Sequence, residues 1–166
     1  MPFEIERKFV ILKPDIEAIC VLPEYTCSDI AQTYLVSDLG VTHRVRRRSY
    51  PDRTVWFETV KRRVSALTAV EEEREITEEE YIALLTRADP DGITLNKRRM
   101  TFAYGGLTFE IDLYPQWDRC CIMEVELERE DASVELPPFI SIVGEVTGNR
   151  DYSNASMARR FPPEPI

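Results

Sequence analysis

The sequence predicts a mainly β (α+β) fold: an eight-stranded antiparallel β-barrel that forms a charged tunnel, with a few flanking helices. Three observations lead to this fold class. Eight segments alternate apolar and polar residues with the period of two that is typical of a half-buried strand. Turn signals such as Leu39-Gly40 and Gly105-Gly106 separate these segments. Helical signals are few and short, and closing the strands into a barrel removes exposed sheet edges.

The expected elements follow from these local patterns in chain order. The strands are predicted at about residues 3–12, 29–37, 41–48, 54–62, 69–76, 94–104, 107–114 and 120–130. Pro14-Asp15 opens a short helix or turn, because proline suits a first helical turn. Thr77 and Glu80 form a capping box for a helix that extends to about Ala88. Pro137-Pro138 breaks the chain, and a last helix is expected over residues 154–160.

The first strand indicates that one face of the sheet is charged. Glu4, Glu6 and Lys8 share a face of this strand, and apolar residues occupy the other. Taken alone, this pattern is typical of any amphipathic strand whose charged side faces water. The same alternation returns in later strands, most of them with one sign of charge. The recurring sets are Arg44 and Arg46; Thr59 and Lys61; Glu71, Glu73 and Glu75; Lys97 and Arg99; Glu110 and Asp112; and Glu124, Glu126 and Glu128.

A barrel with those faces turned inward would have an interior that is too costly to bury dry. It is therefore expected to hold water, metal and a multiply charged ligand. Arg47, Arg48, Arg62, Arg63 and Arg98 are expected on the opposite, outer face.

Length and composition limit the remaining possibilities. The 166 residues fit one domain, residues 1–166. A net charge of −9 argues against broad nucleic-acid or anionic-membrane binding, and no apolar run is long enough to span a membrane. The four cysteines are expected to be reduced thiols in a cytoplasmic protein. His43, the only histidine, is expected to be a surface or packing residue. A homodimer stays an open possibility.

Nine segments occur in an order that is characteristic of one family. They are Glu4-Ile5-Glu6-Arg7-Lys8 (ExExK), Gln32-Thr33-Tyr34-Leu35 (Q-G-Y-L), Arg44-Val45-Arg46 (RxR), Thr59-Val60-Lys61 (T-x-K), residues 71–76 (ExExEI), Lys97-Arg98-Arg99 (KxR), residues 109–114 (W/F-E-V-D-V-F), Glu124-Val125-Glu126-Leu127 (ExEL), and Glu145-Val146-Thr147 with Tyr152 and Asn154 (EVT…Y-x-N). The ordered set resembles the CYTH superfamily, the triphosphate tunnel metalloenzymes, over nearly the whole chain. Thr33 replaces the usual glycine, and Asn149 and Asp151 also depart from the family pattern.

The resemblance implies that a triphosphate and Mg²⁺ or Mn²⁺ bind inside the barrel. The implied phosphate clamp consists of Lys8, Arg44, Arg46, Lys61, Lys97 and Arg99. Glu4, Glu6, Glu124 and Glu126 are the first-choice metal ligands. Asp112, Glu71 and Glu73 are second-choice ligands, or partners that orient the clamp arginines. Lys8 and Tyr34 are the candidate catalytic residues, although Tyr34 is equally well explained as a packed strand aromatic.

The expected activity is hydrolysis of inorganic tripolyphosphate, because the compact chain resembles bacterial inorganic triphosphatases. The alternatives are an adenylyl cyclase or thiamine-triphosphatase of the same family, or a non-catalytic polyphosphate- or nucleotide-binding module. A nucleoside or thiamine substrate would need an aromatic shelf. Trp56 is expected to face away from the tunnel, whereas Trp117 lies in a loop that could reach the mouth.

Overall fold

The computed structural model describes residues 3–166, and the statements below concern these residues. The strands are β1 (Phe3–Leu12), β2 (Thr26–Tyr34), β3 (Val41–Ser49), β4 (Thr54–Arg63), β5 (Thr68–Ile76), β6 (Leu95–Tyr104), β7 (Leu107–Leu113), β8 (Cys120–Glu126) and β9 (Ile142–Glu145). The helices are α1 (Ile16–Cys20), α2 (Glu78–Leu85) and α3 (Asn154–Arg159), with a 3₁₀ turn η1 (Arg150–Tyr152). None of these helices is long and apolar enough to cross a membrane.

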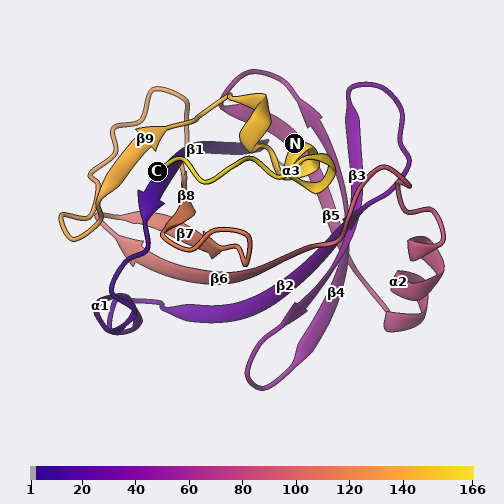
Figure 1. Cartoon of the computed structure of the whole chain (residues 1–166), viewed down its shortest axis with the longest axis horizontal. Helices are drawn as coiled ribbons and strands as arrows, with labels where there is room; N and C mark the ends of the chain where they lie inside the picture. Colours follow the sequence, from indigo (N-terminus) through magenta and orange to yellow (C-terminus); the bar gives the residue numbers. More distant parts are fainter. Residues whose placement is uncertain (1–2) are drawn as a thin grey trace.

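Eight of the strands close into a ring. The antiparallel order β5-β4-β3-β2-β6-β7-β8-β1 returns to its start because β1 also pairs with β5 (Figure 1). The long strand β1 makes this closure possible. Its residues Phe3 to Ile5 pair with β5, and the rest of the strand pairs with β8 from Glu6 onward. The predicted mainly β fold with eight ring strands is therefore confirmed.

Strand β9 was not predicted. It pairs with β1 at Phe9 to Ile11, beyond the point where β5 leaves that edge. Its four residues are too few to show an alternation, and the Pro137-Pro138 pair suggested that the sheet had already ended. Two strands differ from the predicted ranges by more than one residue. β2 begins and ends three residues earlier, with Leu35 just after it in an isolated bridge with Ala88, and β8 ends at Glu126.

Helix capping follows the local sequence. Thr77 and Glu80 form the predicted capping box of α2, with both reciprocal hydrogen bonds present. At α1 the cap is Asp15, whose side chain accepts from the Glu17 amide. Pro14 consequently lies before the helix, and the expectation that it occupies the first turn was wrong.

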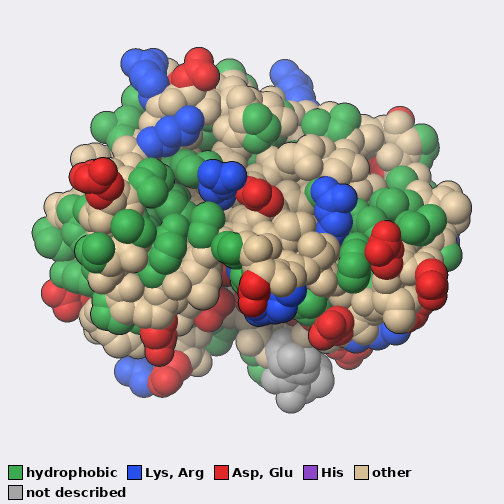
Figure 2. All heavy atoms as spheres, turned by 90° about the horizontal axis from the view of Figure 1, so that it is seen from below, with side chains coloured by type: hydrophobic (Ala, Val, Ile, Leu, Met, Phe, Trp, Pro, Cys, Tyr) green, Lys and Arg blue, Asp and Glu red, His purple; other side chains and the backbone are tan. Residues whose placement is uncertain are grey.

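Two apolar clusters cover the outside of the ring. On one side, Phe9, Met100, Phe109 and Met123 pack with Ile19 of α1 and the loop before β9. On the other side, residues of β3 to β5 pack under α2, which lies outside those strands in Figure 1. The face of the molecule seen in Figure 2 carries acidic and basic side chains interspersed among apolar ones.

A third apolar cluster fills one end of the ring. Val10, Leu95 and Ile122 have the inward parity of Lys8, Lys97 and Glu124 on their strands. They pack with Tyr114 and Trp117, and with Met157 and Ala158 of α3. In Figure 1, α3 and the C-terminal segment lie over the opening of the ring. We call this cluster the apolar plug.

Met157→Ala is expected to lower the free energy of unfolding by about 2–5 kcal/mol, because it leaves a cavity in the apolar plug. Met157 is 1% exposed. The matched control is Ile82→Ala on α2, where the side chain is 57% exposed, and a change within about 0.5 kcal/mol is expected. Urea denaturation of the two variants measures both values, and equal effects would show that α3 does not close the ring.

Candidate functional site

The sheet register brings charged residues of opposite sign together inside the ring. Lys8 lies opposite Glu124, Arg99 opposite Asp112, and Lys61 opposite Glu71. Directly opposed residues of antiparallel strands point to the same face. The predicted inward sets on six different strands therefore share one interior.

Three carboxylates converge at one place in this interior. Glu4, Glu6 and Glu124 each offer an oxygen atom, and these atoms lie within 4.8 Å of one another. Burial, together with the negative charges of Glu124 and Glu4, raises the pKa of Glu6 well above its usual value. The three residues stand on β1 and its neighbour β8, so the strand pairing itself holds them together.

Glu71 extends this acidic cluster from β5. Burial and the adjacent Glu4 carboxylate raise the pKa of Glu71 to about 7. Burial opposes ionisation of Glu4, but the Glu71 contact and the charge of Lys61 hold its pKa well below the usual range. Lys61 Nζ is 3.3 Å from Glu4 Oε2 and 4.0 Å from Glu71 Oε2. Both oxygens are buried without a hydrogen-bond partner. This set of hard oxygen donors fits a divalent cation.

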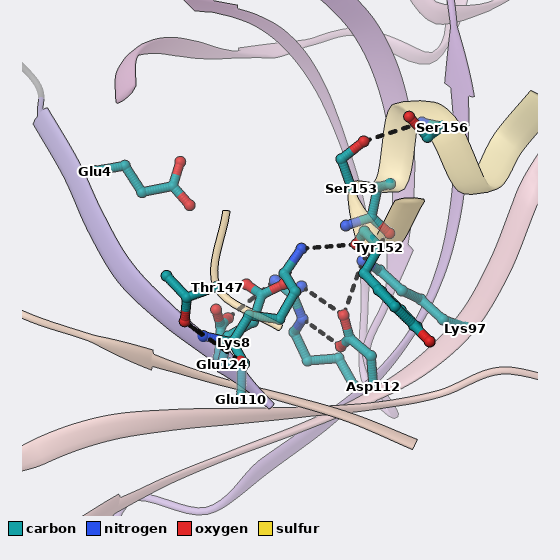
Figure 3. A network of polar contacts seen from close by, with 12 residues as sticks. Glu4, Lys8, Lys97, Glu110, Asp112, Glu124, Thr147, Tyr152, Ser153 and Ser156 are labelled. Carbon is teal, nitrogen blue, oxygen red and sulfur yellow. Dashed lines mark hydrogen bonds and ion pairs between the residues drawn. The ribbon is translucent and has the colours of Figure 1, made fainter. Parts of the chain in front are cut away.

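Lys8 connects the acidic cluster to the C-terminal segment. Its Nζ is 3.4 Å from Glu124 Oε1 and donates a hydrogen bond of 3.0 Å to the carbonyl of Tyr152. The backbone amide of Lys8 donates to Thr147 Oγ1 at 2.9 Å. Figure 3 shows Lys8 pointing toward Tyr152. The segment after β9 thus fixes both the backbone and the side chain of Lys8.

A second group, around Asp112, is saturated with ion pairs. Arg99 donates to both oxygens of Asp112 at 2.8 and 2.9 Å. Lys97 Nζ lies 2.9 Å from Asp112 Oδ2, and Figure 3 shows these two residues together. A further bond of 2.9 Å joins Arg99 to Glu110. Burial disfavours the charged form of Asp112, but Arg99 and Lys97 lower its pKa to about 2. Asp112 is therefore the shared counter-ion of Arg99 and Lys97.

Asn154 at the start of α3 completes the Asp112 group. Its Oδ1 accepts hydrogen bonds from Tyr114 Oη at 2.6 Å and from Lys97 Nζ at 3.3 Å. Burial lowers the pKa of Lys97 to about 8 despite the nearby Asp112. Asn154 was found from the sequence only as part of a motif, because its contact with Lys97 depends on the packing of α3 into the ring.

The arginines on β3 are less fully paired. Arg46 donates one hydrogen bond of 3.2 Å to Glu73, which also accepts from Thr59 at 2.7 Å. Among residues 3–166, no carboxylate forms an ion pair with Arg44. The Nε atoms of Arg44 and Arg46 are both buried without a partner. These guanidinium groups therefore retain donors for an anionic ligand.

The remaining predicted residues lie at the edges of this arrangement. Glu126 is exposed and is not one of the three converging carboxylates. Tyr34 packs against the apolar plug, and its hydroxyl accepts a long hydrogen bond of 3.5 Å from Gln32 Nε2. Tyr34 also borders a hollow of about 450 Å³ beside Asp89 and Arg159. Gln32 was quoted only as part of a motif and was not predicted as a site residue. Its side chain is nevertheless 0% exposed, and its Oε1 has no hydrogen-bond partner.

Two predictions of strand parity were wrong, those for Arg48 and Arg63. Arg48 was placed on the outer face, but it lies two residues after Arg46 and therefore on the same face of β3. Its Nε donates to the buried Ser28 Oγ at 2.8 Å. Arg63 likewise shares the parity of Lys61, although it is exposed at the end of β4.

The tryptophans do not form a shelf inside the ring. Trp56 packs outside it near α2, as predicted. Trp117 is 1% exposed and donates to the Pro162 carbonyl, so the expectation that it reaches the mouth was wrong. His43 is half-buried, with Nε2 2.6 Å from Glu58 Oε2. The four cysteines are free.

Comparisons with known proteins agree with this fold. No protein-family model and no curated protein sequence matches the chain. Among solved structures, the inorganic triphosphatase NE1496 is 27% identical, with 99% of each chain covered and a TM-score of 0.61. PH1819 from Pyrococcus horikoshii OT3 is 21% identical, with 77% of this chain and 80% of that chain covered and a TM-score of 0.59.

A third solved structure is HpAC1 from Hippeastrum, described as having a dominant triphosphatase activity. It is 16% identical, with 76% of this chain and 80% of that chain covered and a TM-score of 0.54. The fold class is thus an antiparallel ring of strands with a charged interior. The chain has the fold of the CYTH, or triphosphate tunnel, family.

Asp112→Asn is expected to lower the free energy of unfolding by about 3–5 kcal/mol, because it leaves the buried Arg99 and Lys97 without their shared counter-ion. The matched control is Asp29→Asn, which removes the partner of Arg98 at the exposed surface and is expected to cost at most about 1 kcal/mol. Thermal and urea denaturation compare the two. A small effect of Asp112→Asn would contradict the description of a tightly paired group.

Proposed function

We propose that the protein is a divalent-metal-dependent triphosphatase that prefers inorganic tripolyphosphate. The observation that carries this proposal is the division of charge inside the ring. Glu4, Glu6 and Glu124 converge, and Glu6 has no ion-pair partner of its own among the described residues, whereas Arg44 and Arg46 keep unused donors. A cation and a polyanion would satisfy both groups at once. The likeness over 99% of its length to the inorganic triphosphatase NE1496 supports the same activity.

The carboxylates and the basic residues take different roles in this proposal. Glu4, Glu6 and Glu124 would hold Mg²⁺ or Mn²⁺, with Glu71 nearby and Glu126 toward the solvent. When bound, the cation would neutralise phosphate charge and lower the pKa of a bound water. Asp112 and Glu73 would orient clamp residues, since each already accepts from arginine. The clamp itself would consist of Lys8, Arg44, Arg46, Lys61, Lys97 and Arg99.

The residues of this chain would promote hydrolysis mainly by position and charge. Arginine pairs with phosphate oxygens through two parallel N–H donors, and lysine acts as a point charge. Together they would compensate the negative charge of the phosphoryl group that is transferred to water. Lys8 is held at the acidic cluster by Tyr152 and Thr147, so it would contact the substrate next to the metal ligands. Tyr34, whose hydroxyl is weakly held by Gln32, is the candidate acid or base.

The positions of the two tryptophans favour an inorganic substrate. Recognition of a nucleobase or a thiamine ring requires an exposed stacking surface. Trp56 lies outside the ring and Trp117 is buried in the apolar plug. The charged groups therefore account for binding of the phosphates. Neither tryptophan offers a surface on which the base or ring of an organic triphosphate could stack.

The first test is a phosphate-release assay with tripolyphosphate, ATP and thiamine triphosphate. Tripolyphosphate is expected to be hydrolysed fastest, and EDTA is expected to abolish the activity until Mg²⁺ or Mn²⁺ is restored. Faster turnover of ATP to cyclic AMP would instead indicate an adenylyl cyclase, and faster turnover of thiamine triphosphate a thiamine-triphosphatase. Tight tripolyphosphate binding without phosphate release in any metal would indicate a non-catalytic binding module.

A second test separates metal ligands from the phosphate clamp on one face of β1. Glu6→Gln keeps the size of the side chain but removes the charge, so it should raise the Mg²⁺ or Mn²⁺ concentration needed for half-maximal rate about tenfold or more. The variant should remain folded, because losing one of three converging charges relieves repulsion. Lys8→Ala should instead raise KM for tripolyphosphate with little change in metal demand.

One result of this second test would contradict the assignment of Glu6 as a metal ligand. An unchanged metal requirement in Glu6→Gln together with a lower Tm would indicate a structural ion-pair role for Glu6. Metal titration of the initial rate and thermal denaturation give both quantities on the same preparations.

A further inference from the structure

The inward face of β3 carries a row of three arginines, of which only two belong to the clamp. Arg44, Arg46 and Arg48 alternate along the strand, so neighbouring members are about 7 Å apart along it. Arg48 is the member next to Ser49, where β3 ends in the β3–β4 turn. A linear anion that contacts Arg44 and Arg46 and continues along β3 would reach Arg48 next.

Arg48 is held in place without being neutralised. Its Nε donates to Ser28 Oγ, which is itself buried on the adjacent strand β2, and its guanidinium lies over the ring of Tyr50 at 5.0 Å. Among residues 3–166, no carboxylate forms an ion pair with it. Its charge also acts on the clamp: burial and then the charges of Arg44, Arg99 and Arg48 lower the pKa of Arg46 to about 10, against the opposing effect of Glu73.

We propose that Arg48, positioned by Ser28 and Tyr50, is a subsite for a phosphate beyond the third, so that the ring accepts linear polyphosphates longer than tripolyphosphate. This inference rests on the proposed function, because it requires that a polyphosphate lies along β3. Arg48 determines chain-length specificity and does not take part in the chemical step.

The surroundings of Arg48 favour an anion over an aromatic ligand. Tyr50 could stack with a nucleobase, but the guanidinium groups of Arg48 and Arg53 already lie over its ring at 5.0 and 4.2 Å. Arg53 has Asp52 as a partner, whereas Arg48 has only the neutral Ser28. Of the charged groups at Tyr50, Arg48 is therefore the one with unused charge.

The experiment compares the dissociation constants of tripolyphosphate and linear tetraphosphate by isothermal titration calorimetry. Each anion is titrated in EDTA and again in Mg²⁺, into the full chain and three variants. Arg48→Gln should weaken tetraphosphate binding about tenfold, the loss of one charged hydrogen-bonding contact, and change tripolyphosphate binding less than twofold. Arg48→Lys should recover part of the loss. The matched control Arg47→Gln, on the outer face of the same strand, should change neither constant.

Each other outcome has a definite meaning. Equal weakening of both anions by Arg48→Gln would make Arg48 an ordinary clamp residue and overturn the chain-length assignment. No change with either anion would reduce Arg48 to a structural contact of Tyr50. If both anions bind but the wild-type chain releases no phosphate in Mg²⁺, the proposed function fails while the ratio of constants still tests Arg48. If neither anion binds the wild-type chain in either buffer, both ideas fail.

Discussion

The burial of unlike charges inside a closed ring is the constraint on which the rest of the structure depends. Removing an ion from water costs several kcal/mol even after relaxation, and an ion pair recovers this only with good geometry and additional hydrogen bonds. The group around Asp112 meets this condition, because Arg99 binds both carboxylate oxygens and Lys97 is also bound by Asn154. The antiparallel register is what places Arg99 opposite Asp112. Strand pairing and charge pairing therefore specify the same ring.

The charged side chains in the interior are not all paired equally well. The fully paired groups stabilise the fold, whereas the incompletely paired ones are available for function. At Asp112 the charges compensate one another. Around Glu4 and Glu6, carboxylates face each other, and at Arg44 the guanidinium has no carboxylate partner among the described residues. Unpaired buried polar atoms destabilise a fold, so such atoms are expected mainly where a ligand completes them. Their separation into an acidic wall on β1 and β8 and a basic wall on β3 is suited to a cation lying beside a polyanion.

Much of this arrangement is encoded locally and could be predicted. The period of two fixes which residues share a face, so inward sets such as Glu4, Glu6 and Lys8 follow from counting along a strand. Arg48 was misplaced although the same counting assigns it correctly beside Arg46. The predictions that could not be made depend on contacts between distant segments. Phe9 to Ile11 of β1 pair with β9, and Asn154 reaches Lys97, only because the chain folds back after β8. Local periodicity holds no information on which strand becomes a neighbour.

The C-terminal segment links the apolar plug to the charged interior. Met157 and Ala158 of α3 fill one end of the ring, and four residues earlier Ser153 caps the same helix. Just before this cap, the Tyr152 carbonyl accepts from Lys8, and just after it Asn154 accepts from Lys97. Apolar packing of a six-residue helix, too short to be stable alone, therefore fixes the positions of two lysines. Because the plug excludes water at that end, the charges near it act through a lower effective dielectric, which strengthens their interaction with a bound anion.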